Sequence, residues 1–499
     1  MKYGKLYKAI LILIYLNLSV FVSYAQFRKL EKRHHSVNKT VKEIIAEPEF
    51  KNADFAFLSV DNKTGEVIAS YCPDKTMIPA STQKLFTTAA ALEILGPEFK
   101  FSTLLQYTGH IDTVSKILYG NIIIKGGGDP TLGSKYFDST KKAQFLTDWV
   151  LAIKQAGIDS VAGAVIGDAS VFDFDIVPIT WSRNNTGNYF GAGANGLTVF
   201  DNYYTLYFDI PDTIGCKPKI IKIVPEIPGL IFDNEAESDS IKYDNLNILG
   251  APYSNIRYLR GKLPAGKKDF GVKGSMPDPA YTTAYTVEKT LKKNGIGVRD
   301  KASTLRLSGN ISGNRTLLTK TDSPELSEII KQTNTHSVNL FAEHLLKQIG
   351  LKLTGNSVTE YAADNIVKFW NGKNIDTQGM YLFDGSGLSR YDGFTPSQMV
   401  GVLSYMKNKS RYFTYFYNSL PVAGETGTMK NMLKETLTKG KLRAKSGTVS
   451  RVKAYAGYVT SVSGRDIIFS MVVNNFSCSS KKAKAQLEKL MIALAAFKK

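Results

Sequence analysis

Apolar and polar residues alternate along several segments of this chain, and an alternation with a period of two residues predicts β-strands. The segment "DFAFLSVDNKTGEVIASY", residues 54–71, predicts a hairpin because turn residues separate two β-rich runs. Three further strand-like runs, "GKLRAKSGT", "AYAGYVTSV" and "DIIFSMVVNN", come near the C-terminus and precede the helical "KAKAQLEKLMIALAAF". We expect the five strands to form one antiparallel sheet flanked by helices, which is an α+β fold.

The pattern changes between residues 98 and 277, where short strands are separated by turn signals, as in "KILYGNIIIKGGGDPTLGS" and "PKIIKIVPEIPGLIF". Helical periodicity returns in "DPAYTTAYTVEKTLKKNGI", residues 278–296. A chain of 499 residues is long for a single ordinary core. We therefore expect a discontinuous domain, residues 26–97 and 278–499, interrupted by a mostly β insertion of residues 98–277.

The first 25 residues have the features of a secretory signal peptide: three lysines, an apolar run from Ala9 to Val22, and small residues before Gln26. We expect cleavage near Ala25–Gln26 and a periplasmic or secreted mature protein. An uncleaved membrane anchor is the alternative, because the apolar run is long for a signal peptide and short for a membrane span.

The formal net charge of +19 favours anionic partners such as acidic cell-wall polymers, although a solvated lysine-rich surface also accounts for it. No motif concentrates this charge for nucleic-acid binding, so we expect no nucleic-acid partner. The three cysteines lack C-x-x-C spacing and the five histidines include no H-E-x-x-H motif. We therefore expect no disulfide framework, no metal and no cofactor.

An apolar helical segment, "MIPASTQKLFTTAAALEILG", begins with Ser81 and Lys84. Residues i and i+3 share a helical face, so the hydroxyl and the amine can lie within hydrogen-bonding distance. Burial and the positive end of the helix dipole both disfavour an ammonium there, which lowers the pKa of the lysine toward that of a general base beside a serine nucleophile. An N-cap serine beside a surface lysine is the alternative. Five other S-x-x-K strings lie in polar stretches or do not open an apolar helix: Ser36, Ser139, Ser404, Ser450 and Ser479.

Two later stretches carry further polar groups next to predicted elements. Ser337 and Asn339 precede a helix in "HSVNLFAEHLLKQIG", where Ser337 taken singly is better explained as a helix cap than as a catalyst. The strand-like "LRAKSGT" ends with a cation, two hydroxyls and a glycine, namely Lys445, Ser446, Gly447 and Thr448. The cation and hydroxyls suit a substrate carboxylate, and a glycine lets a ligand approach the backbone of an edge strand.

The order of these motifs is more specific than any one of them. S-x-x-K on a buried helix, S-x-N before a second helix and K-[ST]-G on a C-terminal strand form the active-serine set of penicillin-binding proteins and class A β-lactamases. With "GGGDPTL", residues 126–132, and "DGSGLSR", residues 384–390, the chain resembles the D-alanyl-D-alanine carboxypeptidases/endopeptidases of the class C low-molecular-mass penicillin-binding proteins, peptidase family S13. The likeness covers nearly the whole mature chain and implies a penicillin-binding/β-lactamase-like domain with a large insertion.

The resemblance also implies a division of catalytic roles. Ser81 would be acylated, Lys84 would activate it, and Ser337 would pass a proton to the leaving group. Ser386 is not the expected nucleophile, because "DGSGLSR" lacks the G-x-S-x-G pattern, and the resemblance places it beside the cleft. The glycines of "GGGDPTL" are expected to form a turn, since the G-K-[ST] end of a phosphate loop is missing.

Substrate contacts follow from the same resemblance. Asn339 would bind the substrate amide, while Lys445 and Ser446 would orient the terminal carboxylate. The backbone N–H groups of Ser81 and Thr448 would form the oxyanion hole. The implied substrates are peptidoglycan peptides, ending in D-Ala-D-Ala or crosslinked through a diamino acid, and the implied covalent inhibitors are β-lactams.

Some positions depart from the family pattern. Ser446 stands where threonine is commoner, and Val338 replaces a frequent aspartate. Asn184 and Asn185 occur where some relatives place an acidic residue near a tryptophan. A serine β-lactamase, recognised by rapid nitrocefin turnover, and a catalytically silent cell-wall scaffold are the alternative functions. The sequence leaves open whether the chain forms a homodimer.

Overall fold

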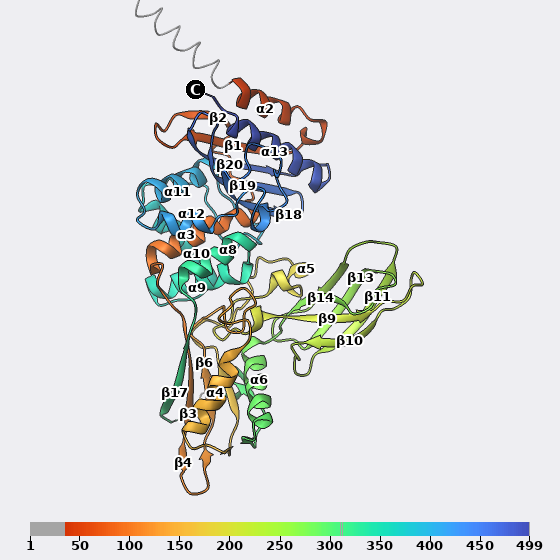
Figure 1. The fold of residues 1–499 in the computed structure, drawn as a ribbon, viewed down its shortest axis with the longest axis vertical. Coiled ribbons are helices and arrows are strands. Elements are labelled where there is room, and N and C mark those ends of the chain that lie inside the picture. Colours follow the sequence, from red (N-terminus) through yellow and green to blue (C-terminus); the bar gives the residue numbers. More distant parts are fainter. Residues whose placement is uncertain (1–34, 310, 312, 499) are drawn as a thin grey trace, which may run out of the picture.

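The computed structural model describes residues 35–309, 311 and 313–498, and the expected signal peptide lies outside these residues. Within the described ranges, no helix combines the length and the apolarity that crossing a membrane requires. Figure 1 shows a domain built around a sheet and covered by helices, with an extended inserted region on the side away from the C-terminus.

The central sheet joins strands from both ends of the chain. Its strand order is β18-β19-β20-β1-β2, and every neighbouring pair is antiparallel. The bounds are Leu442–Val449 for β18, Val452–Thr460 for β19, Asp466–Asn474 for β20, Asp54–Asp61 for β1 and Val67–Tyr71 for β2. The predicted five-stranded antiparallel sheet is therefore confirmed.

Helices cover both faces of this sheet because both faces are apolar. Phe57 belongs to the core beneath α2 (His35–Ile45) and α13 (Ser480–Ala495), whereas its neighbour Leu58 belongs to the core on the opposite face. The opposite core is filled by a helical layer, which Figure 1 shows below the sheet. Its members are α3 (Lys84–Leu95), α8 (Leu326–His336), α9 (Asn339–Thr354), α10 (Thr359–Asn371), α11 (Pro396–Asn408) and α12 (Phe413–Ser419).

Helix α2 lies in a segment for which the sequence analysis predicts no helix. Its buried residues are Val37, Val41 and Ile44, which follow the i, i+4, i+7 spacing of one helical face and pack with α13. The helix was missed because it has only four apolar side chains, Val37, Val41, Ile44 and Ile45, in an otherwise polar stretch. The short helix η1 (Pro48–Phe50) connects α2 to β1.

In the described part of the inserted region, the strands form four small sheets. Their strand orders are β16-β8-β6-β3-β17, β15-β7-β5-β4, β10-β9-β14 and β11-β13-β12. The strands are β3 (Ser102–Thr108), β4 (His110–Asp112), β5 (Ile117–Tyr119), β6 (Ile122–Lys125), β7 (Ser160–Val161), β8 (Val165–Asp168), β9 (Tyr203–Asp209), β10 (Lys219–Val224), β11 (Ile231–Asp239), β12 (Asn245–Leu249), β13 (Ile256–Pro264), β14 (Phe270–Ser275), β15 (Gly297–Val298), β16 (Ser303–Thr304) and β17 (Arg315–Asp322). The helices are α4 (Gln144–Gln155), α5 (Arg183–Thr186), η3 (Tyr189–Gly191), η4 (Phe200–Asn202), α6 (Pro279–Lys293) and α7 (Leu305–Ser308).

Strand pairing carries the insertion beyond residue 277, where the sequence had suggested its end. Strand β17 is antiparallel to β3, with Asp322 opposite Ser102. Helix α6 occurs where a helix was predicted, but its apolar face packs into the core of the inserted sheets. The periodicity of apolar residues predicts that a helix forms, but it does not determine which hydrophobic core the helix joins. We therefore place the far boundary of the insertion near residue 322.

The "GGGDPTL" stretch follows β6 as a tight backbone crossing. A Cβ added to Gly126 would lie 2.1 Å from the carbonyl oxygen of Gly196, and one added to Gly127 would lie 2.2 Å from that of Ser102. Two other chain segments thus pass directly against these glycines, which accounts for them without a phosphate ligand.

Candidate active site

Ser81 and Lys84 lie at the junction of two helical turns. Ser81 belongs to the short 3₁₀ helix η2 (Ala80–Gln83), and α3 begins at Lys84. In a 3₁₀ turn the residues i and i+3 are eclipsed. The Nζ of Lys84 lies 3.1 Å from the Oγ of Ser81, so the predicted pair is within hydrogen-bonding distance.

Lys84 is fully buried, and two carbonyl oxygens accept hydrogen bonds from its amine. Its Nζ donates to the Oδ1 of Asn339 at 2.6 Å and to the main-chain oxygen of Ser386 at 2.7 Å. Burial lowers the pKa of Lys84 to about 8, although three nearby acidic side chains oppose this shift: Asp384, Glu343 and Asp392. The lowered pKa makes the uncharged amine accessible near neutral pH.

Ser337 and Lys445 form a second hydroxyl and amine pair. Ser337 ends α8 in the left-handed conformation, with φ of 59°, and this turn directs the chain into α9. The Nζ of Lys445 donates to the Oγ of Ser337 at 2.9 Å and to the main-chain oxygen of Ser446 at 2.7 Å. Burial, and then the charge of Lys84, hold the pKa of Lys445 well below its ordinary value.

The remaining predicted residues follow Lys445 on β18. The Oγ of Ser446 donates to the Oγ1 of Thr428 in η5 (Gly427–Met429) at 2.8 Å, and Thr448 Oγ1 accepts from Lys453 at 2.9 Å. Gly447 serves a contact that we had assigned to a ligand. A Cβ there would lie 2.6 Å from the oxygen of Pro79, so the glycine lets β18 lie against the turn that carries Ser81.

These groups converge on a cavity of about 580 Å³. Four of the predicted residues line it, namely Ser81, Ser337, Asn339 and Thr448, while Lys84 and Lys445 are buried beside it. One wall comes from the insertion and another from the segment after Asp384. The further lining residues are Ser182, Asn184, Asn185, Tyr189, Phe190, Gly387, Leu388, Arg390, Val449 and Ser450.

Sequence reasoning missed the groups that position this constellation. The Nδ2 of Asn339 donates to the main-chain oxygen of Phe190 in the insertion, at 2.8 Å. The carboxyl group of Asp384 accepts from Gln83 and, at 2.7 Å, from the indole nitrogen of Trp181. Asp384 opens the "DGSGLSR" stretch that we had noted, but no local pattern reveals partners so far away in the sequence.

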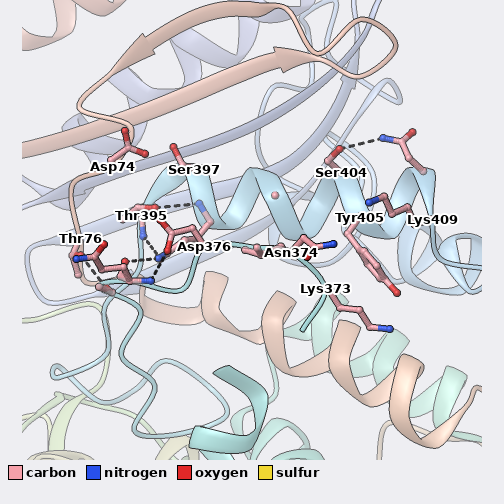
Figure 2. A pocket seen from close by; sticks show the side chains of 16 residues that line it. Asp74, Thr76, Lys373, Asn374, Asp376, Thr395, Ser397, Ser404, Tyr405 and Lys409 are labelled. Carbon is pink, nitrogen blue, oxygen red and sulfur yellow. Dashed lines mark hydrogen bonds between the residues drawn. The ribbon is translucent and has the colours of Figure 1, made fainter. Parts of the chain in front are cut away.

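A separate hollow of about 680 Å³ lies along α11 and contains one of the rejected S-x-x-K serines (Figure 2). The Oγ of Ser404 accepts from Asn408 at 3.2 Å. Lys407, the lysine of that motif, instead forms an ion pair with Asp466. Serine and lysine thus have different partners there, in contrast to Ser81 and Lys84.

Comparisons with known proteins show which family the chain resembles. The model of the D-Ala-D-Ala carboxypeptidase 3 (S13) family matches residues 37–497. The chain is 28% identical over 452 residues to a D-alanyl-D-alanine carboxypeptidase of Actinomadura sp., covering 88% of this chain and 81% of that protein. It is 27% identical over 449 residues to D-alanyl-D-alanine carboxypeptidase DacB of Haemophilus influenzae, covering 88% of each.

A solved structure shows the same fold. Penicillin binding protein 4 from Haemophilus influenzae matches with a TM-score of 0.78 and 24% identity, over 91% of this chain and 98% of that one. The expected penicillin-binding α+β fold is therefore confirmed. From the family match over nearly the whole described chain, we conclude that this protein belongs to the D-Ala-D-Ala carboxypeptidase 3 (S13) family and is a serine carboxypeptidase.

Proposed function

We propose that the protein hydrolyses peptidoglycan peptides through an acyl-enzyme on Ser81, both at terminal D-Ala-D-Ala and at D-Ala–diamino acid crosslinks. The observation that carries this proposal is the environment of the Lys84 amine, which faces the Ser81 hydroxyl and two carbonyl oxygens. The family match supports the carboxypeptidase reaction, and the endopeptidase reaction is our extension of it.

The three oxygen atoms around the Lys84 amine suit a neutral amine that acts as a base. An uncharged amine has two N–H donors and one lone pair, and the two shortest contacts are those to Asn339 and Ser386. With both N–H groups used there, the lone pair faces Ser81 and accepts its proton as the Oγ attacks. With a pKa of about 8, about one amine in ten is uncharged at pH 7.

Ser337 passes a proton to the leaving group. A hydrogen bond connects the Ser337 hydroxyl, which lines the cavity, to the buried amine of Lys445, whose pKa is lowered. As the tetrahedral intermediate collapses, the Ser337 hydroxyl passes to the departing amine the proton that Lys84 took from Ser81, so Lys84 returns to its neutral form, while the hydrogen bond from Lys445 orients the hydroxyl. The result is release of D-alanine, or of the crosslinked strand, from acylated Ser81.

Substrate is held by groups around this pair. Asn339 binds the substrate amide, Lys445 and Ser446 attract its carboxylate, and the N–H groups of Ser81 and Thr448 stabilise the oxyanion. Asn184 and Asn185 in the insertion wall offer neutral amides to the side chain of the substrate. A neutral amide attracts an amine less strongly than a carboxylate does, so we expect little preference for a charged diamino acid.

β-Lactams are expected to acylate the same serine. A penicillin binding protein 4 structure from Haemophilus influenzae is described as complexed with a novel β-lactam. Among the described residues that line the cavity there is no carboxylate to activate a water, which favours slow release of the drug over β-lactamase turnover. A location outside the cytoplasm, after removal of the signal peptide, is part of the same proposal.

The test is covalent labelling followed by product analysis. Mass spectrometry after incubation with penicillin should show one adduct on Ser81, absent in Ser81→Ala and retained in the control Ser404→Ala. Incubation with crosslinked muropeptides should then release D-alanine and monomers. A wild-type protein that never forms the adduct would exclude the mechanism, and rapid nitrocefin turnover would favour a β-lactamase.

A further inference from the structure

Asp384 lies buried behind the catalytic lysine and organises the turn that follows it. Its two carboxylate oxygens accept six hydrogen bonds, four of them from main-chain N–H groups within its own turn. Those four donors are Ser386, Gly387, Leu388 and Ser389, at 2.6 to 3.0 Å. The carboxylate therefore fixes the shape of this turn.

The turn matters because Ser386 supplies an acceptor to Lys84. The main-chain oxygen of Ser386 accepts a hydrogen bond from the Lys84 amine at 2.7 Å. The Asp384 carboxylate also accepts, at 3.0 Å, from Gln83, the residue directly before Lys84. One buried acid thus contacts both the helix start that carries the lysine and the turn that orients its amine.

The sixth donor comes from the insertion. The indole Nε1 of Trp181 lies 2.7 Å from the Asp384 Oδ2, and the Trp181 side chain is only 6% exposed. The next residues along the chain, Ser182, Asn184 and Asn185, line the substrate cavity. The same segment therefore forms a cavity wall and reaches the acid behind the lysine.

We propose that Trp181 is a positioning residue through which the insertion holds the Asp384 turn, and with it the Lys84 amine, in the geometry required for acylation. The inference rests on the proposed acyl-enzyme mechanism. It makes the insertion part of the catalytic machinery, in addition to its contribution to the cavity wall.

The physical basis is the sharing of one carboxylate oxygen. The Oδ2 of Asp384 accepts from Trp181, Leu388 and Ser389. Without the indole donor this oxygen loses one of its three charge-assisted bonds, and its negative charge is less compensated. The turn can then relax and move the Ser386 oxygen relative to the amine.

A less compensated carboxylate also favours the ammonium form of Lys84. The charged and titratable groups that face this amine are three acids and one lysine: Asp384, Glu343, Asp392 and Lys445. Burial raises the pKa of Glu343 to about 8 and that of Asp392 well above its ordinary value. Loss of the indole contact should therefore raise the pKa of Lys84 and shift the acidic side of the pH–rate profile for acylation to higher pH.

The experiment compares Trp181→Phe with Trp149→Phe in the full chain. Trp149 in α4 is an apt control because it is also a buried insertion tryptophan with one indole hydrogen bond, to Thr321 Oγ1 at 2.9 Å. The second-order rate of acylation by a fluorescent penicillin is measured from pH 5.5 to 9.5, with thermal melting of each variant. We expect Trp181→Phe to be acylated about 10-fold more slowly, with the acidic side of its pH–rate profile shifted to higher pH. Trp149→Phe should match wild type in both the rate and the pH–rate profile.

Two results would overturn the inference while leaving the acyl-enzyme mechanism intact. One is a Trp181→Phe protein with the acylation rate and the pH–rate profile of wild type. The other is equal slowing of both variants with no shift of the pH–rate profile, which indicates that either substitution loosens the packing of the insertion. If Trp181→Phe does not fold, benzothienylalanine at position 181 removes the N–H while keeping the ring shape, and the same readouts apply. Failure of wild type to acylate would instead refute the proposed function.

Discussion

Replacing Gly447 with alanine tests whether β18 and the nucleophile turn must touch. The new Cβ would lie 2.6 Å from the Pro79 oxygen and 3.1 Å from the nitrogens of Ser81 and Thr82. The first distance is about 0.8 Å short of ordinary van der Waals contact. The Pro79 oxygen cannot retreat freely, because it already accepts from the Thr82 hydroxyl at 2.8 Å.

The strain should appear in catalysis more than in stability. Overpacking of this size costs about 1 to 3 kcal/mol, which in a chain of this length lowers the melting temperature by a few degrees. A displacement approaching 1 Å between a nucleophile and its catalytic partners can cost about 100-fold in rate. We therefore expect Gly447→Ala to fold and to acylate about 100-fold more slowly.

The assay is the second-order rate of labelling by a fluorescent penicillin, followed by stopped flow, with circular dichroism melting of the same samples. Gly401→Ala in α11 is the matched control, since its Cβ would meet only Ile375 atoms, at 3.6 Å or more. That control should label at the wild-type rate. Wild-type labelling by Gly447→Ala would show that the strand does not constrain the turn, and the account of this glycine would be wrong.

Three further outcomes concern Lys84, Ser337 and the buried acid Asp129. The rate of wild-type acylation should rise about tenfold per pH unit below 8 and level off above it, because only the neutral Lys84 amine acts as a base; a flat profile from pH 6 to 9 would contradict this. Ser337→Ala should lower D-alanine release by about 100-fold or more through loss of proton transfer, measured with an amino-acid oxidase assay, and undiminished release would exclude the relay. Burial raises the pKa of Asp129 to about 6, so the folded state binds its proton more tightly and the free energy of unfolding falls as pH rises from about 4 to 6. Asp129→Asn should remove that fall and add up to about 3 kcal/mol at pH 7, with no gain at pH 4; equal effects at both pH values in urea titrations would refute it.

The sequence was most informative where structure is local. The Ser81 and Lys84 pair could be predicted because three residues of helix determine whether two side chains share a face. The hairpin of β1 and β2 was predictable for the same reason, since adjacent strands and turn residues carry their own signal. The ordered motifs then made a family resemblance visible.

Contacts between distant segments could not be read in this way. Trp181 and Asp384 are 203 positions apart, and neither has a neighbour whose pattern points to the other. Helix α6 was expected as a helix, yet the core that receives it depends on tertiary packing. Gly447 was singled out for the approach of a ligand, whereas in the structure the backbone of Pro79 makes the close approach.

The antiparallel pairing of Ser102 with Asp322 means that the chain leaves the peptidase body and returns to it at almost the same point. A module whose two chain connections lie this close together can be gained, exchanged or lost during evolution without reordering the strands of its host. The indole contact at position 181 would then be the kind of later adaptation that makes an inserted module necessary for the activity of its host.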